Sequence, residues 1–261
     1  MRNGSPGSQM SLNEIADPRV MGEFIAASEG RRYVYDLLSR LYAREVDEGL
    51  LGGLIDAAED GSLAARFEAL AELDERVGKG IDMILDYLRT AAKRDRKEVI
   101  LELAADYASL FLGIKGTPPH PSESAYMSAG HLIYQEQRDD VLDIYRDMGV
   151  DKVKEFTEPE DHVAVELSFM SYLIGRTVEE VEKGNLGEAR RLMGIQGRFL
   201  DEHLLKWLHE LAKDVEENAD VDFYRGLAYL TDGFISLDGL SLKELASMLE
   251  NYTPDRSRLK S

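Results

Sequence analysis

Apolar residues recur at helical spacing along almost the whole chain, and this pattern constrains its fold most. The first stripe consists of Val34, Leu37, Leu38 and Leu41, which fall at i, i+3, i+4 and i+7 on one helical face. No stretch alternates Val, Ile or Thr with polar residues between turn residues, as a strand would. The sequence therefore predicts an all-α fold of roughly ten helices. Similar stripes lie near residues 50–55, 63–70, 81–88, 99–111, 139–148, 163–182, 186–212, 221–237 and 242–249.

Glycine and proline residues between Gly113 and Pro121 mark the clearest internal boundary, because they end a helix and force an extended path. We expect one domain over residues 23–252, made of two packed subdomains at about 23–113 and about 158–252, joined by a connection at about 113–157. Residues 1–22 are predicted to be a flexible segment and residues 253–261 a tail. A second helix break is predicted at Ser236–Ser241.

The chain is strongly acidic, with 50 Asp and Glu residues against 31 Lys and Arg residues and a formal net charge of -19. Such a charge repels nucleic acid and anionic lipid, so we expect cationic partners and no nucleic acid. The absence of cysteine excludes disulfides, thiolate metal sites and thiol catalysis for this chain alone. No apolar run reaches the roughly 20 residues of a membrane span, which predicts a cytoplasmic protein without stable membrane insertion.

The pair Arg31 and Arg32 could be mistaken for a twin-arginine export signal. Asp36 and Arg40 interrupt the segment that should then be uncharged. We therefore interpret the pair as part of a helix surface.

The run Glu158–Met170 combines acidic residues, a histidine and a helical stripe. Thr157 and Glu160 have the spacing of a capping box, and Pro159 would then lie in the first helical turn. We therefore expect a helix to begin here, with acidic side chains at its N-terminus. These side chains either cap the helix or form a binding site.

Motifs with a clear catalytic mechanism are largely absent. No glycine-rich phosphate loop is found, and no histidine has a glutamate three residues before it, as a di-iron bundle requires. His162 and Glu166 could share a metal or a proton, or could hydrogen-bond to each other and to the cap. The turn at Gly113–Gly116 could bind an anion with its backbone N–H groups or form a helix C-cap. Trp207 could pack in the hydrophobic core or stack on a ligand. A metal- or nucleotide-dependent helical enzyme using His162 and Glu166 is the alternative function, although missing ligands favour a protein that is not an enzyme.

Three blocks of sequence, in this order, resemble the TorD/DmsD/NarJ family of redox-enzyme maturation chaperones. The first is Tyr107–Gly113 followed by Pro119–Tyr126, which is similar to the family's aromatic helix end and Glu-Ser-x-Tyr loop. The second is Glu158–His162, similar to its Glu-Pro-x-Asp-His signature. The third is His203–Leu208 with Asp222–Tyr224. The resemblance covers most of residues 31–238, with His209 in a place where relatives often carry proline.

The resemblance implies a cytoplasmic, TorD-like all-α chaperone. Such a protein holds the catalytic subunit of a molybdenum-cofactor oxidoreductase, in many cases through its twin-arginine leader peptide, until the cofactor is inserted. It implies no cofactor of the chain's own apart from weak guanine-nucleotide binding, and a monomer or homodimer that includes a domain-swapped form. The motif residues expected to bind the peptide or client are Tyr107, Phe111, Glu123, Tyr126, Glu158, Pro159, Asp161, His162 and Glu166.

Elementary energetics constrain such binding. A leader peptide is cationic and this chain anionic, so encounter is favoured, but exposed ion pairs contribute only about 0–1 kcal/mol each. Ordering a disordered peptide costs roughly 2–5 kcal/mol, whereas each buried apolar side chain contributes about 1.5–3 kcal/mol. We therefore expect Asp161 and Glu158 to orient the arginines, and an apolar groove between the subdomains to supply most of the affinity.

Overall fold

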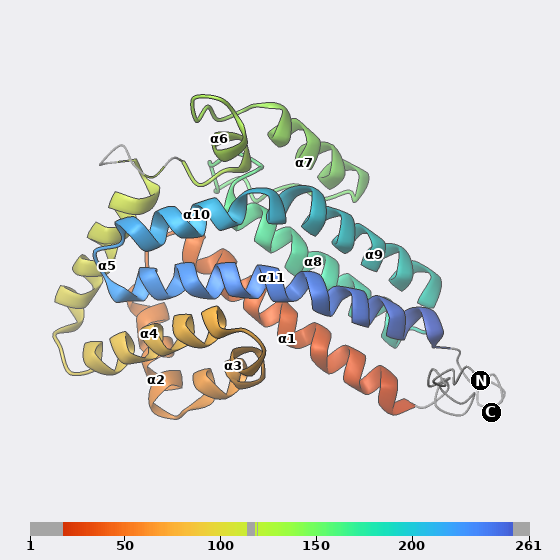
Figure 1. Ribbon diagram of the computed structural model, residues 1–261, viewed down its shortest axis with the longest axis horizontal. Coiled ribbons are helices and arrows are strands. Elements are labelled where there is room, and N and C mark those ends of the chain that lie inside the picture. The colour runs from red at the N-terminus through yellow and green to blue at the C-terminus, as the bar shows by residue number, and fades with distance from the viewer. Residues whose placement is uncertain (1–17, 114–117, 119, 253–261) are drawn as a thin grey trace, which may run out of the picture.

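The computed structural model describes residues 18–113, 118 and 120–252, and it is built from helices (Figure 1). Over these residues the all-α prediction is confirmed, since they contain no β-strand and only an isolated bridge between Ser122 and His162. Predictions for residues 1–17, 114–117, 119 and 253–261 lie outside them. The elements are α1 (Pro18–Ala43), α2 (Glu48–Glu59), α3 (Ser62–Leu73), α4 (Glu75–Ala91), α5 (Arg96–Phe111), α6 (Glu123–Met127), α7 (Glu136–Asp147), α8 (Val163–Glu182), α9 (Leu186–Phe199), the π-helical turn η1 (Leu200–Leu204), α10 (Leu205–Asn218) and α11 (Asp222–Asn251).

Helices from before and after the central connection pack directly on each other. The largest contacts join α1 to α8 and α4 to α11, and α11 also packs against α9 and α10. In Figure 1, α2–α5 lie at one end of the bundle formed by α1 and α8–α11, while α6 and α7 cover one edge of this bundle. Buried side chains from both parts of the sequence form one hydrophobic cluster, with Trp207, Tyr35 and Tyr42 among its largest members. The two expected subdomains therefore share a core, and their boundaries stay a prediction.

The crossing of α4 and α11 depends on two glycines that bring the backbones together. A Cβ atom at Gly80 would lie 2.5 Å from the amide nitrogen of Leu230, and one at Gly226 would lie 2.8 Å from the carbonyl oxygen of Gly80. Neither neighbour is the end of a flexible side chain, so neither can move without shifting a helix. Neither glycine position therefore has room for a side chain.

Replacing Gly80 with alanine is therefore expected to lower the free energy of unfolding by about 1–3 kcal/mol, as overpacking does in other cores. Gly52→Ala in α2 is the matched control, because nothing lies within 4 Å of its added Cβ. It should be neutral or stabilising by up to about 1 kcal/mol. Urea unfolding of both variants measures the difference, and equal stability of the two would contradict the account of this crossing.

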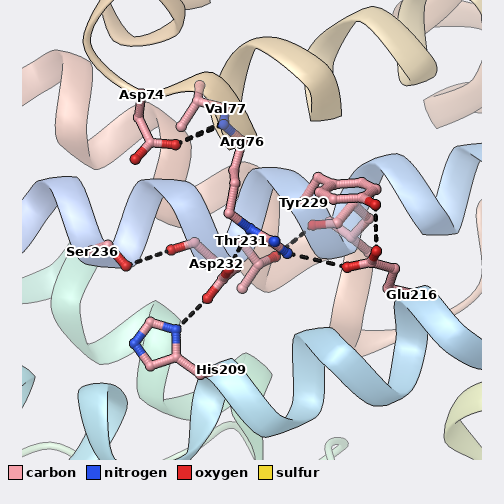
Figure 2. A network of polar contacts seen from close by, with 10 residues as sticks. Asp74, Arg76, Val77, His209, Glu216, Tyr229, Thr231, Asp232 and Ser236 are labelled. Carbon is pink, nitrogen blue, oxygen red and sulfur yellow. Dashed lines mark hydrogen bonds and ion pairs between the residues drawn. The ribbon is translucent and has the colours of Figure 1, made fainter.

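A polar network on the outer side of α4, α10 and α11 ties these helices together (Figure 2). Arg76 of α4 donates to Glu216 of α10 at 3.2 Å and forms an ion pair with Asp232 of α11. Asp232 also contacts His209, and the Tyr229 hydroxyl donates to Glu216. His209, which stands where relatives often carry proline, lies inside a regular α10 and forms part of this network.

The predicted helix break at Ser236–Ser241 is wrong, because α11 runs through it without interruption. Asp238 lies inside this segment and is buried, where it accepts hydrogen bonds from Arg31 of α1 at 3.0 Å and from Tyr35 at 2.7 Å. Gln196 of α9 accepts a further hydrogen bond from Arg31 at 3.1 Å. The interpretation of Arg31 as a surface residue is therefore also wrong, since it is only 6% exposed. A buried ion pair between distant helices overrides the local turn preference.

Other helix boundaries differ by smaller amounts. Residues Pro18–Gly22, expected to be flexible, belong to α1. The stripe expected over residues 186–212 is divided by the π-helical turn Leu200–Leu204, and its last part continues to Asn218. No helix among the described residues combines the length and the apolar character that a bilayer span requires.

Candidate functional site

Two motifs that are far apart in the sequence meet at the start of α8. The amide nitrogen of Val163 donates to the carbonyl oxygen of Pro121 at 2.9 Å, and that of Glu123 donates to the carbonyl oxygen of Asp161 at 2.9 Å. The Asp161 carboxylate accepts another hydrogen bond, from the Ser124 amide at 2.8 Å. We call these contacts between 121–124 and 161–163 the loop latch.

Helix α8 begins at Val163, as the helical stripe over residues 163–182 predicted, but other residues cap it than those expected. Its N-cap is His162, whose Nδ1 accepts from the Ala164 amide at 3.1 Å. The capping box of Thr157 and Glu160 is therefore wrong, and Pro159 is buried in the segment before the helix instead of in its first turn. The Glu160 carboxylate is occupied elsewhere, by Arg138 at 2.6 Å and by Lys152 at 3.3 Å.

The central residues of this motif are buried. Asp161 and Glu166 are 0% exposed and His162 is 3% exposed. Burial lowers the pKa of His162 to about 3, helped by the nearby charges of His120 and Lys152. A neutral imidazole can accept from a backbone N–H, so at neutral pH His162 serves as the cap of α8. In this structure Asp161 and Glu166 do not face solvent, and His162 is almost completely covered.

His162 and Glu166 have different side-chain partners. The expected hydrogen bond between them is wrong, whereas the expected role of His162 at the cap is confirmed. Glu166 accepts a hydrogen bond from the indole Nε1 of Trp207 at 3.1 Å. Beside it, Glu123 of α6 contacts Nδ1 of His203 at 2.9 Å. Trp207 is completely buried and is thus a core residue, as its spacing predicted. Among the described residues, no three His, Asp or Glu side chains are arranged so that they could hold a metal ion.

The aromatic motif residues lie on both sides of the latch. Tyr107 donates to the carbonyl oxygen of Tyr42 at 2.9 Å, and the rings of Tyr107 and Phe111 are 5.0 Å apart. Tyr126 donates to Asp214 at 3.0 Å and packs its ring on Trp207. Gly113, at the end of α5, has a φ of 68°, which suits the C-cap interpretation.

A groove opens between α1, α8 and the irregular segment 150–156. Its apolar end has a volume of about 350 Å³, and a wider end of about 880 Å³ continues from it. We call the whole the α1–α8 groove. The two ends share Ser39, Ala43, Val153 and Phe156.

The two ends of the α1–α8 groove differ in chemistry. Aromatic and aliphatic side chains line most of the first end, together with Asp151 and Lys152. The second end has five carboxylates and two arginines besides apolar residues. Among the predicted site residues, the wide end is lined by Tyr107, Phe111, Glu158 and His162, and those outside both ends are Glu123, Tyr126, Pro159, Asp161 and Glu166. The apolar end includes Tyr145, Val150, Val165, Phe169 and Tyr172, and the wide end includes Arg40, Arg44, Glu45, Asp47, Glu155 and Glu158.

Comparison with known proteins identifies the family. The model of the nitrate reductase delta subunit family matches residues 70–213. The chain is 30% identical to the chaperone protein TorD of Photobacterium profundum, over 85% of this chain and 98% of that protein. It is 29% identical to TorD of Vibrio parahaemolyticus, over 85% of this chain and 99% of that protein. It is 28% identical to TorD of Shewanella loihica, over 81% of this chain and 92% of that protein.

The chain therefore belongs to the nitrate reductase delta subunit family, and its resemblance to the TorD and NarJ chaperones is confirmed. The relatives are named chaperones, and this family is not enzymatic. The alternative of a metal- or nucleotide-dependent enzyme thus finds no support among them.

The loop latch predicts that Asp161 is needed mainly for folding. Asp161→Ala leaves the buried Ser124 amide without its acceptor, which should lower the free energy of unfolding by about 1–3 kcal/mol. Glu155→Ala is the control, because that exposed carboxylate lies nearby on the groove rim and should change stability by less than about 0.5 kcal/mol. Thermal unfolding compares the two, and a fully stable Asp161→Ala protein would show that the latch does not depend on this carboxylate.

Proposed function

We propose that this protein is a cytoplasmic maturation chaperone for a molybdenum-cofactor oxidoreductase. In this proposal it binds the cationic leader peptide of the catalytic subunit in the α1–α8 groove and holds that subunit until the cofactor is inserted. The observation that carries the proposal is the pairing of an apolar end with an acidic end in one groove. The TorD relatives support the chaperone role.

The acidic end suits the basic part of such a peptide. Glu45 and Glu155 are exposed on its rim, and Glu158 is partly exposed beside His120. Asp47 is already paired, with Arg40 at 2.7 Å and with Arg44 at 3.7 Å. We therefore assign the orientation of the arginines to Glu45 and Glu155, and not to Glu158, which contacts His120 at 2.9 Å, or to the buried Asp161.

The apolar end suits the hydrophobic stretch that follows the arginines in such a leader. Phe156, Phe169 and Tyr172 offer aromatic surfaces there, and Val153 is 67% exposed at the junction of the two ends. Each apolar peptide side chain buried in this end would contribute about 1.5–3 kcal/mol. Three or four such contacts exceed the roughly 2–5 kcal/mol needed to order the peptide. Charge therefore guides the peptide and determines its direction, while apolar burial holds it.

Val153→Glu tests the groove without disturbing the core, because the side chain is already mostly in water. A carboxylate at the junction should weaken binding of a twin-arginine leader peptide about tenfold or more, since the apolar stretch would have to desolvate it. Isothermal titration calorimetry with a synthetic leader peptide measures the dissociation constant.

Leu101→Glu is the matched control, because Leu101 is 69% exposed on α5 and does not line either end of the groove. It introduces the same charge and should leave the affinity unchanged. Equal affinities of the two variants would refute the groove as the site. Absence of binding by the unchanged protein, to leaders and mature subunits alike, would refute the function itself.

A further inference from the structure

A cluster of buried acids lies beside the first turns of α8. Glu123, Asp161 and Glu166, which we call the buried acid cluster, are 2%, 0% and 0% exposed. They come from α6, from the residue before the α8 cap and from α8 itself. None of them is needed as a ligand by the proposed function. Their burial together requires a separate physical explanation, because each would be stabilised by water if it were ionised and exposed.

The cluster contains more carboxyl groups than cations. His203 of η1 contacts Glu123, and it can supply at most one positive charge. Lys152, whose charge acts on the neighbouring His162, is engaged with Glu160 at 3.3 Å. The groups that face Glu166 from the elements packed around it are Glu123 from α6, Tyr145 from α7, Asp161 from the segment before α8, His203 from η1 through Glu123, and the neutral indole of Trp207 from α10.

One oxygen of Glu166 shows how the imbalance is resolved. Its Oε2 accepts from Trp207, but its Oε1 is fully buried and finds no N–H or O–H donor among the described residues. The carboxyl group of Glu123 interacts with that of Glu166, both as a nearby charge and as a side-chain hydrogen-bond partner. Two carboxyl groups can form a hydrogen bond only if one of them carries a proton. Burial raises the pKa of Glu166 well above its ordinary value, and the charges of Glu123 and Asp161 act in the same direction.

We propose that Glu166 is protonated at neutral pH and donates this proton to Glu123, so that one buried proton holds α6 against α8. Ionisation of Glu166 would place two like charges side by side in the protein interior. The contact between α6 and α8 would then be unfavourable, and the loop latch beside it would loosen. The buried acid cluster is therefore a switch that opens at alkaline pH.

The same helical turns of α8 also form one wall of the α1–α8 groove, through Val165 and Phe169. Loosening of α6 would therefore shift these turns of α8 and change the shape of the groove. That consequence rests on the proposed function, whereas the following experiments use the protein without any peptide. Their failure would therefore leave the proposed function standing.

Infrared spectroscopy at pH 7 detects the proton directly. The spectrum of the unchanged protein should contain the carbonyl band of a protonated carboxyl group, and Glu166→Gln should remove this contribution. Glu180→Gln is the matched control: it lies on the same helix, is 7% exposed and is bonded to Lys183 and Asn185, which lower its pKa. Glu180→Gln should keep the band. A spectrum of the unchanged protein without the band, or one that Glu166→Gln leaves unaltered, would overturn the proposal.

The pH dependence of unfolding provides the second test. The pKa of Glu166 is raised in the folded state, so the folded protein binds one proton more than the unfolded chain at pH values between the two pKa values. The stability from this proton is complete below the unfolded pKa and is lost as the pH rises toward the folded pKa. The unfolding constant of the unchanged protein should therefore rise, relative to that of Glu166→Gln, by up to about tenfold per pH unit.

Fluorescence of Trp207, the only tryptophan in the chain, follows this unfolding in urea at several pH values from 5.5 to 8.5. The unfolding constant of the unchanged protein divided by that of Glu180→Gln should be constant over this range, because Glu180 is ionised in both the folded and the unfolded state. If the unfolding constant of the unchanged protein divided by that of Glu166→Gln were also constant, Glu166 would be ionised in the folded protein, and the proposal would be wrong.

Discussion

The loop latch is the interaction on which the rest of this structure depends. Two backbone hydrogen bonds and the Asp161 carboxylate join residues 121–124 to residues 161–163. A pairing this short is unstable in water by itself. Here it is buried and ends in the N-cap of α8, so the connection and the long helices stabilise each other. The segment 150–156, which forms one wall of the α1–α8 groove, precedes this latch in the sequence and is joined to residues 158 and 160 through Lys152.

Buried polar contacts between distant helices set how the long helices align. Arg31 and Asp238 join α1 to α11, and Glu166 and Trp207 join α8 to α10. Breaking one such pair leaves an uncompensated buried group, which is strongly destabilising. A sliding movement of one helix along another would break them, so the hydrophobic core alone does not define the arrangement. The partly exposed network around Arg76 in Figure 2 is screened by water and contributes less.

Local sequence patterns predicted much of the helical structure but little of the site. The expected helix from Val163 to Glu182 has these bounds in the structure, and Gly149 ends α7 with a φ of 68°. These features depend on neighbours in the sequence. The continuity of α11 through Asp238 depends on a partner that is 207 positions away, which no local pattern contains.

The Glu158–His162 motif shows the same limit within the candidate site. Its position between the two parts of the chain could be predicted, and so could a helix close behind it. The burial of Asp161 could not, because the residues that cover it come from α6 and α8 together. Lining residues of the groove such as Tyr145 and Val153 belong to no motif that was recognised in the sequence. They meet only when α1, α7 and α8 have packed.

The most direct test of the central claim, that a leader peptide lies in the α1–α8 groove, is site-specific photo-crosslinking. A photoreactive amino acid at Val153 and one at Leu101 would be compared on the folded protein with the same leader peptide, and the adducts mapped by mass spectrometry. The account predicts adducts at position 153, formed with the apolar stretch next to the two arginines, and none at position 101. Adducts at position 101, or a saturating peptide that leaves position 153 unlabelled, would contradict it.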